Sequence, residues 1–301
     1  MKESSGRIDK IINSNMLNPI DNQIRNLLKS GLETLEQQLD SDIYTYYGPI
    51  EDSIIRVIKH TIENIALEKK HTRLSIILTT GGGSATAVER YVNIIRNFYD
   101  EVNFIVPDFA YSAGTIFCMS GDNIYMNYYS VLGPIDPQVM NKDRRWVPAL
   151  GYLDKINELI EKAHKGTLTN AEFLILKDFD LAELKGYEQA KELTIDLLKK
   201  WLVKYKFKNW TKKKTSGVLV TQEMKEKRAE EIADRLSDNK TWKSHGRPIN
   251  IEILRDSLNL VIEDYGKNPK LSTNIDSYYS LLDDHVRKNG LQLFIQTRNF
   301  L

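Results

Sequence analysis

The sequence is nearly free of cysteine. Cys118 is the only one among 301 residues, so no disulfide can form within the chain. Disulfide frameworks belong to oxidising compartments, and a chain without one suits a reducing compartment. The segment MKESSGRIDKIINSN at the N-terminus is polar and lacks the apolar run of a signal peptide. These two absences predict a cytoplasmic protein.

Long apolar runs and an excess of one charge are also absent. No stretch approaches the roughly 20 apolar residues that a helix needs to cross a bilayer. Lys and Arg number 42 and Asp and Glu number 41, so no overall charge favours nucleic acid or a membrane as a partner. There is no HExxH motif, and the GGGS segment lacks the lysine of a P-loop. We therefore expect no nucleic acid, no membrane, no metal and no cofactor.

The sequence does contain an alternation of short apolar runs and helical periods. Strands are predicted at 44–50, 74–80, 102–107 and 123–133, and helices at 19–40, 51–70, 84–99 and 112–121. Strands alternating with helices imply a parallel sheet with crossover helices, which makes the fold class α/β. Beyond residue 150 nearly all patterns are helical. We therefore expect an N-terminal helical arm at 1–40, a core at 41–150 and a C-terminal helical region at 151–301.

Two chemically distinctive segments each follow a predicted strand. Gly81-Gly82-Gly83 follows 74–80, and Ser112 follows 102–107. The carboxyl ends of parallel strands meet at one edge of a sheet, where sites form. Glycines allow backbone N–H groups to turn outward, and a serine nucleophile needs such donors to hold an oxyanion. The segments fit a serine nucleophile, although a tight turn and a helix N-cap are also compatible with them.

Longer motifs around these residues resemble a known family. TTGGGSA, followed by YSAGTIFCMSGDNIYMNYYSVLGPIDPQ, is similar to the serine dehydrogenase proteinase family of the Clp protease–crotonase superfamily, related to signal peptide peptidase A. One departure is Gly81, where many relatives have proline. The resemblance implies a Clp protease/crotonase-like core and a serine peptidase that forms an acyl-enzyme at Ser112. It also implies Gly82 and Ala113 as backbone oxyanion donors, a peptide or unfolded protein as substrate, and a homo-oligomer.

The general base has two candidates. The segment SVLGPIDPQV, where Clp proteases carry their histidine, contains none, and Asp136 stands near that place. Signal peptide peptidases and their archaeal relatives use a Ser-Lys dyad, and resemblance to them points to Lys155. A lysine acts as a base only when burial lowers its pKa, and apolar residues flank Lys155. His245, in TWKSHGRPI, is the competitor because histidine needs little tuning.

Two other functions stay open at this point. A crotonase-type acyl-CoA enzyme would use the same oxyanion hole, but it needs no serine at position 112. A catalytically inactive scaffold would bind peptides without cleaving them. For the serine peptidase, we expect the region 151–301 to complete the site and to contribute to oligomerisation.

Overall fold

The computed structural model describes residues 19–140, 146–213 and 216–300. Its centre is a six-stranded sheet with the order β10-β5-β3-β2-β1-β11. In that order the strands are Glu263–Asp264, Asn123–Met126, Glu101–Ile105, Arg73–Thr79, Asp42–Tyr47 and Phe294–Gln296. All neighbours pair in parallel except β1 and β11, which are antiparallel. The predicted α/β fold with a parallel sheet is confirmed.

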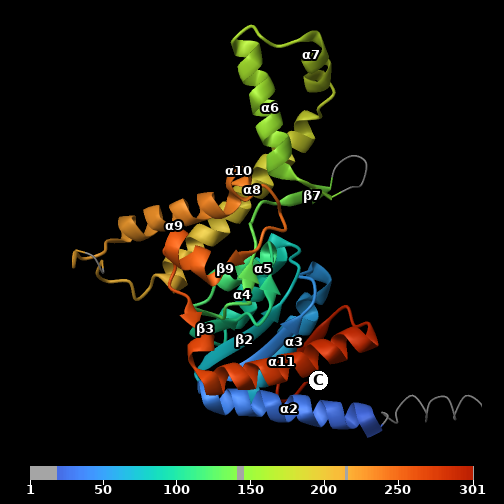
Figure 1. Ribbon diagram of the computed structural model, residues 1–301, viewed down its shortest axis with the longest axis vertical. Coiled ribbons are helices and arrows are strands. Elements are labelled where there is room, and N and C mark those ends of the chain that lie inside the picture. The colour runs from blue at the N-terminus through green and yellow to red at the C-terminus, as the bar shows by residue number, and fades with distance from the viewer. Residues whose placement is uncertain (1–18, 141–145, 214–215, 301) are drawn as a thin grey trace, which may run out of the picture.

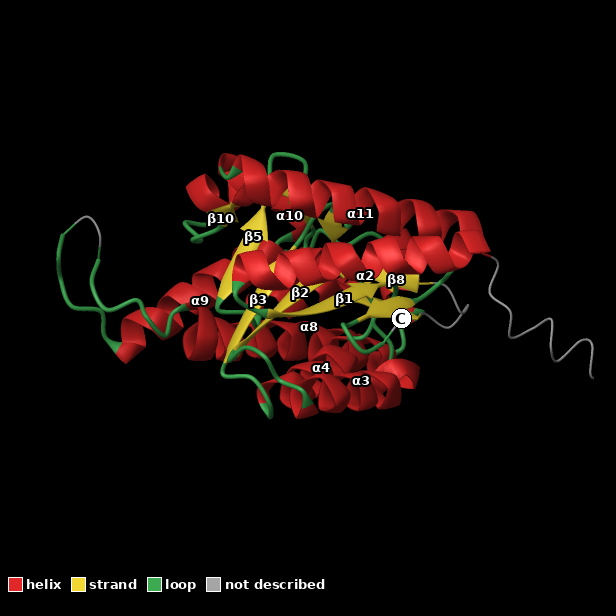
Figure 2. Cartoon of the chain, turned by 90° about the horizontal axis from the view of Figure 1, so that it is seen from below, coloured by secondary structure: helices red, strands yellow, loops and turns green. Residues whose placement is uncertain are grey.

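Helices cover both faces of this sheet (Figure 2). One face carries α3 (Ile55–Leu67), α4 (Ala85–Arg96), α5 (Ala113–Met119) and α8 (Leu181–Trp201). The other face carries α2 (Pro19–Leu39) and α11 (Pro269–Asn289), which lie side by side although they come from opposite ends of the chain (Figure 1). The middle strands are therefore buried on both sides, which explains why their sequences are continuously apolar.

The described part of the expected N-terminal arm is packed rather than extended. Leu28, Leu32 and Leu35 lie at helical spacing on α2 and are fully buried in the core of that face. Helix α2 is thus part of the sheet's covering layer. Residues 1–18 of the expected arm lie outside the described residues.

The C-terminal region is mainly helical but also returns to the sheets. Its remaining helices are α6 (Ala149–His164), α7 (Asn170–Lys177), α9 (Gln222–Ser237) and α10 (Asn239–Trp242), with π-helical turns η2 (Leu202–Lys206) and η3 (Ile253–Ser257). Short 3-10 turns are η1 (Asp52–Ile54) and η4 (Tyr265–Lys267). Strands β10 and β11 extend the central sheet, and β9 (Ile249–Asn250) joins a small sheet with β4 (Phe109–Ala110) and β6 (Val131–Leu132). Residue 150 is therefore not a physical boundary of the sheet.

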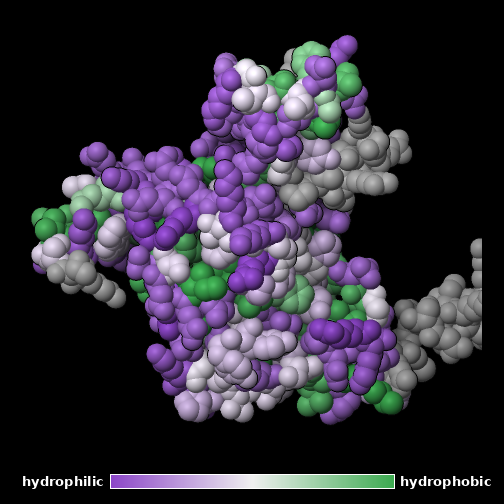
Figure 3. Space-filling view, turned by 45° about the horizontal axis from the view of Figure 1, so that its top comes forward, coloured by the Kyte–Doolittle hydropathy of each residue, from purple (hydrophilic) through white to green (hydrophobic). Residues whose placement is uncertain are grey.

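Helices α6 and α7 project from the body, at the top of Figure 1. They follow a two-stranded pair, β7 (Gln138–Met140) and β8 (Trp146–Pro148). Apolar side chains are visible near the far end of this projection in Figure 3, and Phe173, Leu174 and Ile175 of α7 are all exposed. Among the described residues, no helix combines the length and apolar character that crossing a membrane requires.

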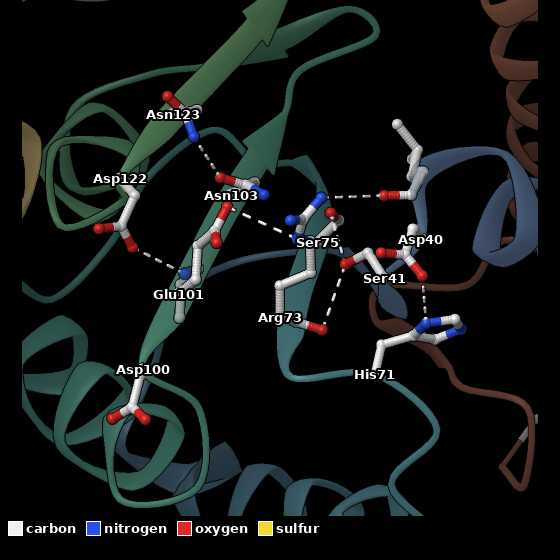
Figure 4. A network of polar contacts seen from close by, with 12 residues as sticks. Asp40, Ser41, His71, Arg73, Ser75, Asp100, Glu101, Asn103, Asp122 and Asn123 are labelled. Carbon is white, nitrogen blue, oxygen red and sulfur yellow. Dashed lines mark hydrogen bonds and ion pairs between the residues drawn. The ribbon is translucent and has the colours of Figure 1, made fainter.

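Polar contacts tie neighbouring strands together at their amino ends (Figure 4). Ser75 at the start of β2 donates to Ser41, just before β1, over 2.8 Å. Asn123 of β5 donates to Asn103 of β3 over 2.9 Å. These side-chain bonds help to fix the strand register at one end of the sheet. The opposite, carboxyl end is where Ser112 and the glycine segment lie.

Candidate active site

Ser112 occupies a strained turn between β4 and α5. Its φ is 52° and its ψ is −115°, and Gly114 N–H donates to Tyr111 C=O over 2.8 Å across it. These angles match the first central position of a type II′ turn, which favours glycine. Ser112 also precedes the first residue of α5, yet its side chain makes no capping hydrogen bond. Its hydroxyl is therefore not used to stabilise the helix, which removes the simplest alternative to a chemical role.

The glycine segment lies directly against this turn. Gly82 and Gly83 have φ angles of 108° and 145°. A Cβ on Gly82 would lie 2.9 Å from the Cβ of Ser112, and one on Gly83 would lie 2.1 Å from the carbonyl oxygen of Ile50. Neither close approach is available to a residue with a side chain. Glycine at these two positions is thus required by the geometry of the site.

The backbone N–H groups near Ser112 differ in whether they already have a hydrogen-bond acceptor. The N–H of Gly82, which the resemblance implied as an oxyanion donor, donates to Thr80 Oγ1 over 3.1 Å. The N–H of Gly83 has no acceptor among the residues that the structure describes, and Gly83 lines the cavity beside Ser112. Ala113 lines it too, and as the first residue of α5 it has no acceptor within the helix. The amides of Gly83 and Ala113 are therefore both without an acceptor in the described part of the chain, as is that of Gly81, which also lines the cavity.

Ser112 and His245 line the same cavity, which has a volume of about 600 Å³. Helix α8 supplies one wall, although it belongs to the region after residue 150. The wall includes apolar residues and two carboxylates: Ile50, Ile116, Ile135, Ala190 and Leu193, and Glu51 and Asp52. A volume of this size and a mixed lining are typical of ligand sites.

The imidazole of His245 is held by a buried carboxylate. Its Nδ1 lies 2.8 Å from Oδ1 of Asp136, a residue 109 positions earlier in the chain. An ionised carboxylate only accepts hydrogen bonds, so Nδ1 carries the proton and Nε2 is left as an acceptor. The side chain of Asp136 is almost completely buried, and its Oδ2 has no hydrogen-bond partner among the described residues. Asp136 thus fixes both the orientation and the tautomer of His245.

Lys155 lies elsewhere. It is on α6, its side chain is half exposed, and its Nζ is 3.0 Å from Oε2 of Glu158. It is not among the residues that line the cavity. The structure does not bring Lys155 to Ser112 within one chain, because α6 leads away from the body. The burial that a lysine base requires is also missing.

Comparison with known proteins identifies the family. The model of the family described as ClpP-like SDH-type serine proteinase matches residues 39–223, which is more than half of the chain. The chain belongs to this family. The recognition made from the sequence motifs is therefore confirmed. The matched stretch includes Ser112 and Asp136, whereas His245 lies beyond it.

Individual relatives of this ClpP-like chain carry little functional information. Two uncharacterized proteins of Methanocaldococcus jannaschii are similar: MJ1495, 31% identical over 170 residues, and MJ0137, 28% identical over 169 residues. Each match covers 56% of this chain, with 51% of MJ1495 and 52% of MJ0137. The chain thus spans about half the length of the curated relatives it matches. Among solved structures, a mutant of the 1510-N membrane-bound stomatin-specific protease is similar at 22% identity and a TM-score of 0.31, over 46% of this chain and 72% of that one.

Sequence reasoning missed three features of the site. The sequence places Asp136 near the position of the Clp histidine but does not pair it with His245. The resemblance implies Gly82 rather than Gly83 as the donor, and the sequence singles out no helix of the region 151–301 as a wall of the site. A carboxylate inside the apolar segment VLGPIDP was the one available signal, since a buried acid needs a partner.

Proposed function

We propose that this ClpP-like serine proteinase hydrolyses peptide bonds through an acyl-enzyme at Ser112. His245 is the general base, Asp136 orients it, and the amides of Gly83 and Ala113 form the oxyanion hole. The single observation that carries the proposal is the shared cavity of Ser112 and His245, with Asp136 bonded to Nδ1 of the imidazole. This arrangement leaves Nε2 on the ring as the proton acceptor.

In the proposed reaction these residues act as follows. Nε2 of His245 takes the proton of the Ser112 hydroxyl as the oxygen attacks the scissile carbonyl. The carbonyl oxygen becomes an oxyanion, and two fixed N–H donors stabilise it without reorganising. The imidazolium, stabilised by Asp136, then protonates the leaving amine. Water attacks the acyl-enzyme by the same route and restores Ser112.

His245 is a better base than Lys155 on the observations above. The lysine is half exposed and paired with Glu158, whereas the histidine lines the cavity and has one ring nitrogen unoccupied by Asp136. The Ser-Lys dyad expected from the resemblance would need Lys155 from another copy of the chain or a large movement of α6.

Labelling with a fluorophosphonate probe, followed by peptide mapping, tests this proposal. We expect one labelled residue, Ser112, and none in Ser112→Ala. The variants His245→Ala and Asp136→Asn should slow labelling by about 100-fold or more, the usual contribution of a positioned base. Lys155→Ala is the matched control and should label like the wild type.

Other results would point elsewhere. If Lys155→Ala abolished labelling and His245→Ala spared it, the base would be the lysine. No cleavage of unfolded casein by either wild type or Ser112→Ala, with no labelling, would favour an inactive scaffold. A crotonase-type acyl-CoA enzyme would also escape the probe, but it would turn over an acyl-CoA thioester.

We further propose that substrates are peptides or unfolded proteins and that the chain forms a homo-oligomer. The support for self-association is α7, in which Phe173, Leu174 and Ile175 are exposed side by side in the sequence. Consecutive residues point in different directions around a helix. A second copy of the chain would therefore have to cover α7 from more than one side to bury all three side chains. Phe173→Ser with Leu174→Ser should lower the mass measured by analytical ultracentrifugation. An unchanged mass would rule out α7 as the contact.

A further inference from the structure

Thr80 touches both halves of the candidate site. It directly follows β2 and is 1% exposed. Its N–H donates to the carbonyl of Phe109 over 3.1 Å, and its carbonyl accepts from the N–H of Tyr111 over 3.0 Å. The main chain of Thr80 thus holds the residues that lead into Ser112.

The methyl group of Thr80 supports the other side of the nucleophile turn. A Cβ on Gly114 would lie 2.4 Å from Cγ2 of Thr80, so the first turn of α5 packs directly on this methyl. Any residue larger than glycine at 114 would lift the helix. The position of Ser112 relative to the sheet is therefore set by contacts with Thr80 both before and after it.

The hydroxyl of Thr80 fixes the glycine segment. Its Oγ1 accepts the N–H of Gly82 over 3.1 Å. On the far side, the N–H of Ser84 donates to the carbonyl of Ile50 over 2.8 Å. With the amides of residues 82 and 84 both engaged, the amide between them, on Gly83, is left to the cavity.

We infer that Thr80 is the positioning residue of the oxyanion hole, an inference that rests on the proposed function. Three consecutive glycines have little conformational preference of their own, so the direction of the Gly83 amide depends on outside contacts. The Thr80 hydroxyl supplies one, and the same residue holds the turn that carries Ser112. Thr80 touches no substrate; it acts by aligning the Gly83 donor with the nucleophile.

The variants Thr80→Val and Thr80→Ser test this assignment in the full chain. Valine keeps the shape and removes the acceptor, whereas serine keeps the hydroxyl. For cleavage of a fluorogenic peptide, we expect Thr80→Val to lower kcat by about 10- to 100-fold, less than the complete loss of an oxyanion donor. KM should stay within about twofold, because the donor acts mainly in the transition state. Thr80→Ser keeps the hydroxyl but loses the methyl beside Gly114, so it should retain more activity than Thr80→Val.

Inhibition by a peptide aldehyde distinguishes a role in the oxyanion hole from a merely structural role of Thr80. The aldehyde binds Ser112 as a hemiacetal whose oxygen occupies the oxyanion hole. Its inhibition constant should weaken in Thr80→Val by the same factor as kcat, because both depend on the Gly83 donor. The matched control is Thr79→Val. Thr79 is the buried neighbour whose hydroxyl donates to Tyr279 over 3.3 Å on the other face of the sheet.

Several outcomes would overturn the assignment. Wild-type kcat in Thr80→Val would do so, as would losses in Thr80→Val and Thr79→Val that are equal and follow the melting temperature. If Thr80→Val does not fold, Thr80→Cys replaces it, since a thiol is similar in size but a weak acceptor; full activity in Thr80→Cys would then reject the role. Failure of the proposed function is recognised separately, because Ser112→Ala would then be as active as the wild type.

Discussion

At the scale of the residue, the backbone of Ser112 has a free-energy cost. A non-glycine residue at φ 52° and ψ −115° is strained by about 1–3 kcal/mol. Glycine relieves this strain but gains freedom in the unfolded chain, which offsets part of the benefit. We expect Ser112→Gly to unfold with a free energy about 1 kcal/mol higher than that of Ser112→Ala. Both variants should be inactive.

Urea denaturation of the two Ser112 variants measures this difference. Comparison with alanine rather than with the wild type removes the effect of losing the hydroxyl. If Ser112→Ala were as stable as Ser112→Gly, the backbone of residue 112 would not be strained in the folded protein.

Lys206 gives a second prediction at this scale, through pH. It lies at the end of η2 and donates to the carbonyl of Asp122 over 3.3 Å. Burial lowers the pKa of Lys206 to about 8, and the carboxylates of Glu263 and Asp122 only partly oppose this. Between pH 8 and the unfolded pKa near 10.5, the unfolded chain binds more protons than the folded one. The contribution of Lys206 to stability should therefore increase as pH rises through this window.

Lys206→Met removes that titration. At pH 7 we expect the variant to be more stable than the wild type by about 1–2 kcal/mol, with the gap closing as pH approaches 10. Lys204→Met, on the exposed side of η2, is the matched control and should show no such trend. If the difference in unfolding free energy between Lys206→Met and the wild type did not change with pH, Lys206 would keep its proton throughout.

At the scale of the element, the seat of α5 on β2 depends on Gly114. Gly114→Ala would place a Cβ 2.4 Å from Thr80 Cγ2, whereas a Cβ on Gly81 would meet nothing within 4 Å. We expect Gly114→Ala to lower the unfolding free energy by about 1–3 kcal/mol through overpacking and to slow fluorophosphonate labelling of Ser112. Gly81→Ala should change neither by much. Equal labelling rates in the two variants would show that the reactivity of Ser112 does not depend on the close approach of α5 to Thr80.

The elements that the sequence predicted well are those with buried, continuous apolar runs. The strands expected at 74–80 and 102–107 are β2 and β3, because parallel strands covered on both faces need such runs. The single strand expected at 123–133 is wrong. It is split into β5 and β6, in different sheets, because Asn127 Oδ1 accepts from the N–H groups of Tyr129 and Ser130 and turns the chain.

The candidate site was predictable only where it is local. Ser112 and Ala113 follow from one short motif at a strand end. The choice of Gly83 over Gly82 as the oxyanion donor depends on the hydrogen bond that engages the N–H of Gly82 with Thr80. The partnership of His245 with Asp136 joins segments 109 residues apart and has no local periodicity. The apolar neighbours of Lys155 suggested burial, but Ile156 is buried while Lys155, about 100° away around α6, is half exposed.

At the scale of the whole molecule, the last strand closes the sheet far from the site. Strand β11 pairs with the edge of β1, and Arg298, two residues later, is buried between two carboxylates. It pairs with Asp42 and lies 3.6 Å from Glu36 of α2. Burial raises the pKa of Glu36, and the Arg298 guanidinium counteracts that rise. Arg298 thus places one positive charge between two buried acids that lie more than 250 residues earlier in the chain.

Arg298→Met should therefore destabilise the fold without altering the chemistry. Removing one partner of a buried ion pair costs about 3–5 kcal/mol, because the remaining charge is left uncompensated. Without the guanidinium, the folded pKa of Glu36 rises further above its unfolded value, so the variant recovers stability as pH falls through that higher pKa. Urea denaturation at pH 7 and pH 5 should show a smaller deficit at pH 5.

Two controls distinguish the loss of the buried Arg298 ion pairs from the loss of any one positive charge. Arg287→Met removes the exposed partner of Asp283 on α11 and should change stability little, because exposed pairs are well solvated. Fluorophosphonate labelling of Ser112 in Arg298→Met should match the wild type below the melting temperature, since Arg298 lies near the amino ends of the strands. A deficit that is equal at both pH values would mean that packing, not charge, holds the C-terminus in place. Loss of labelling in the folded variant would mean that the two ends of the sheet are coupled.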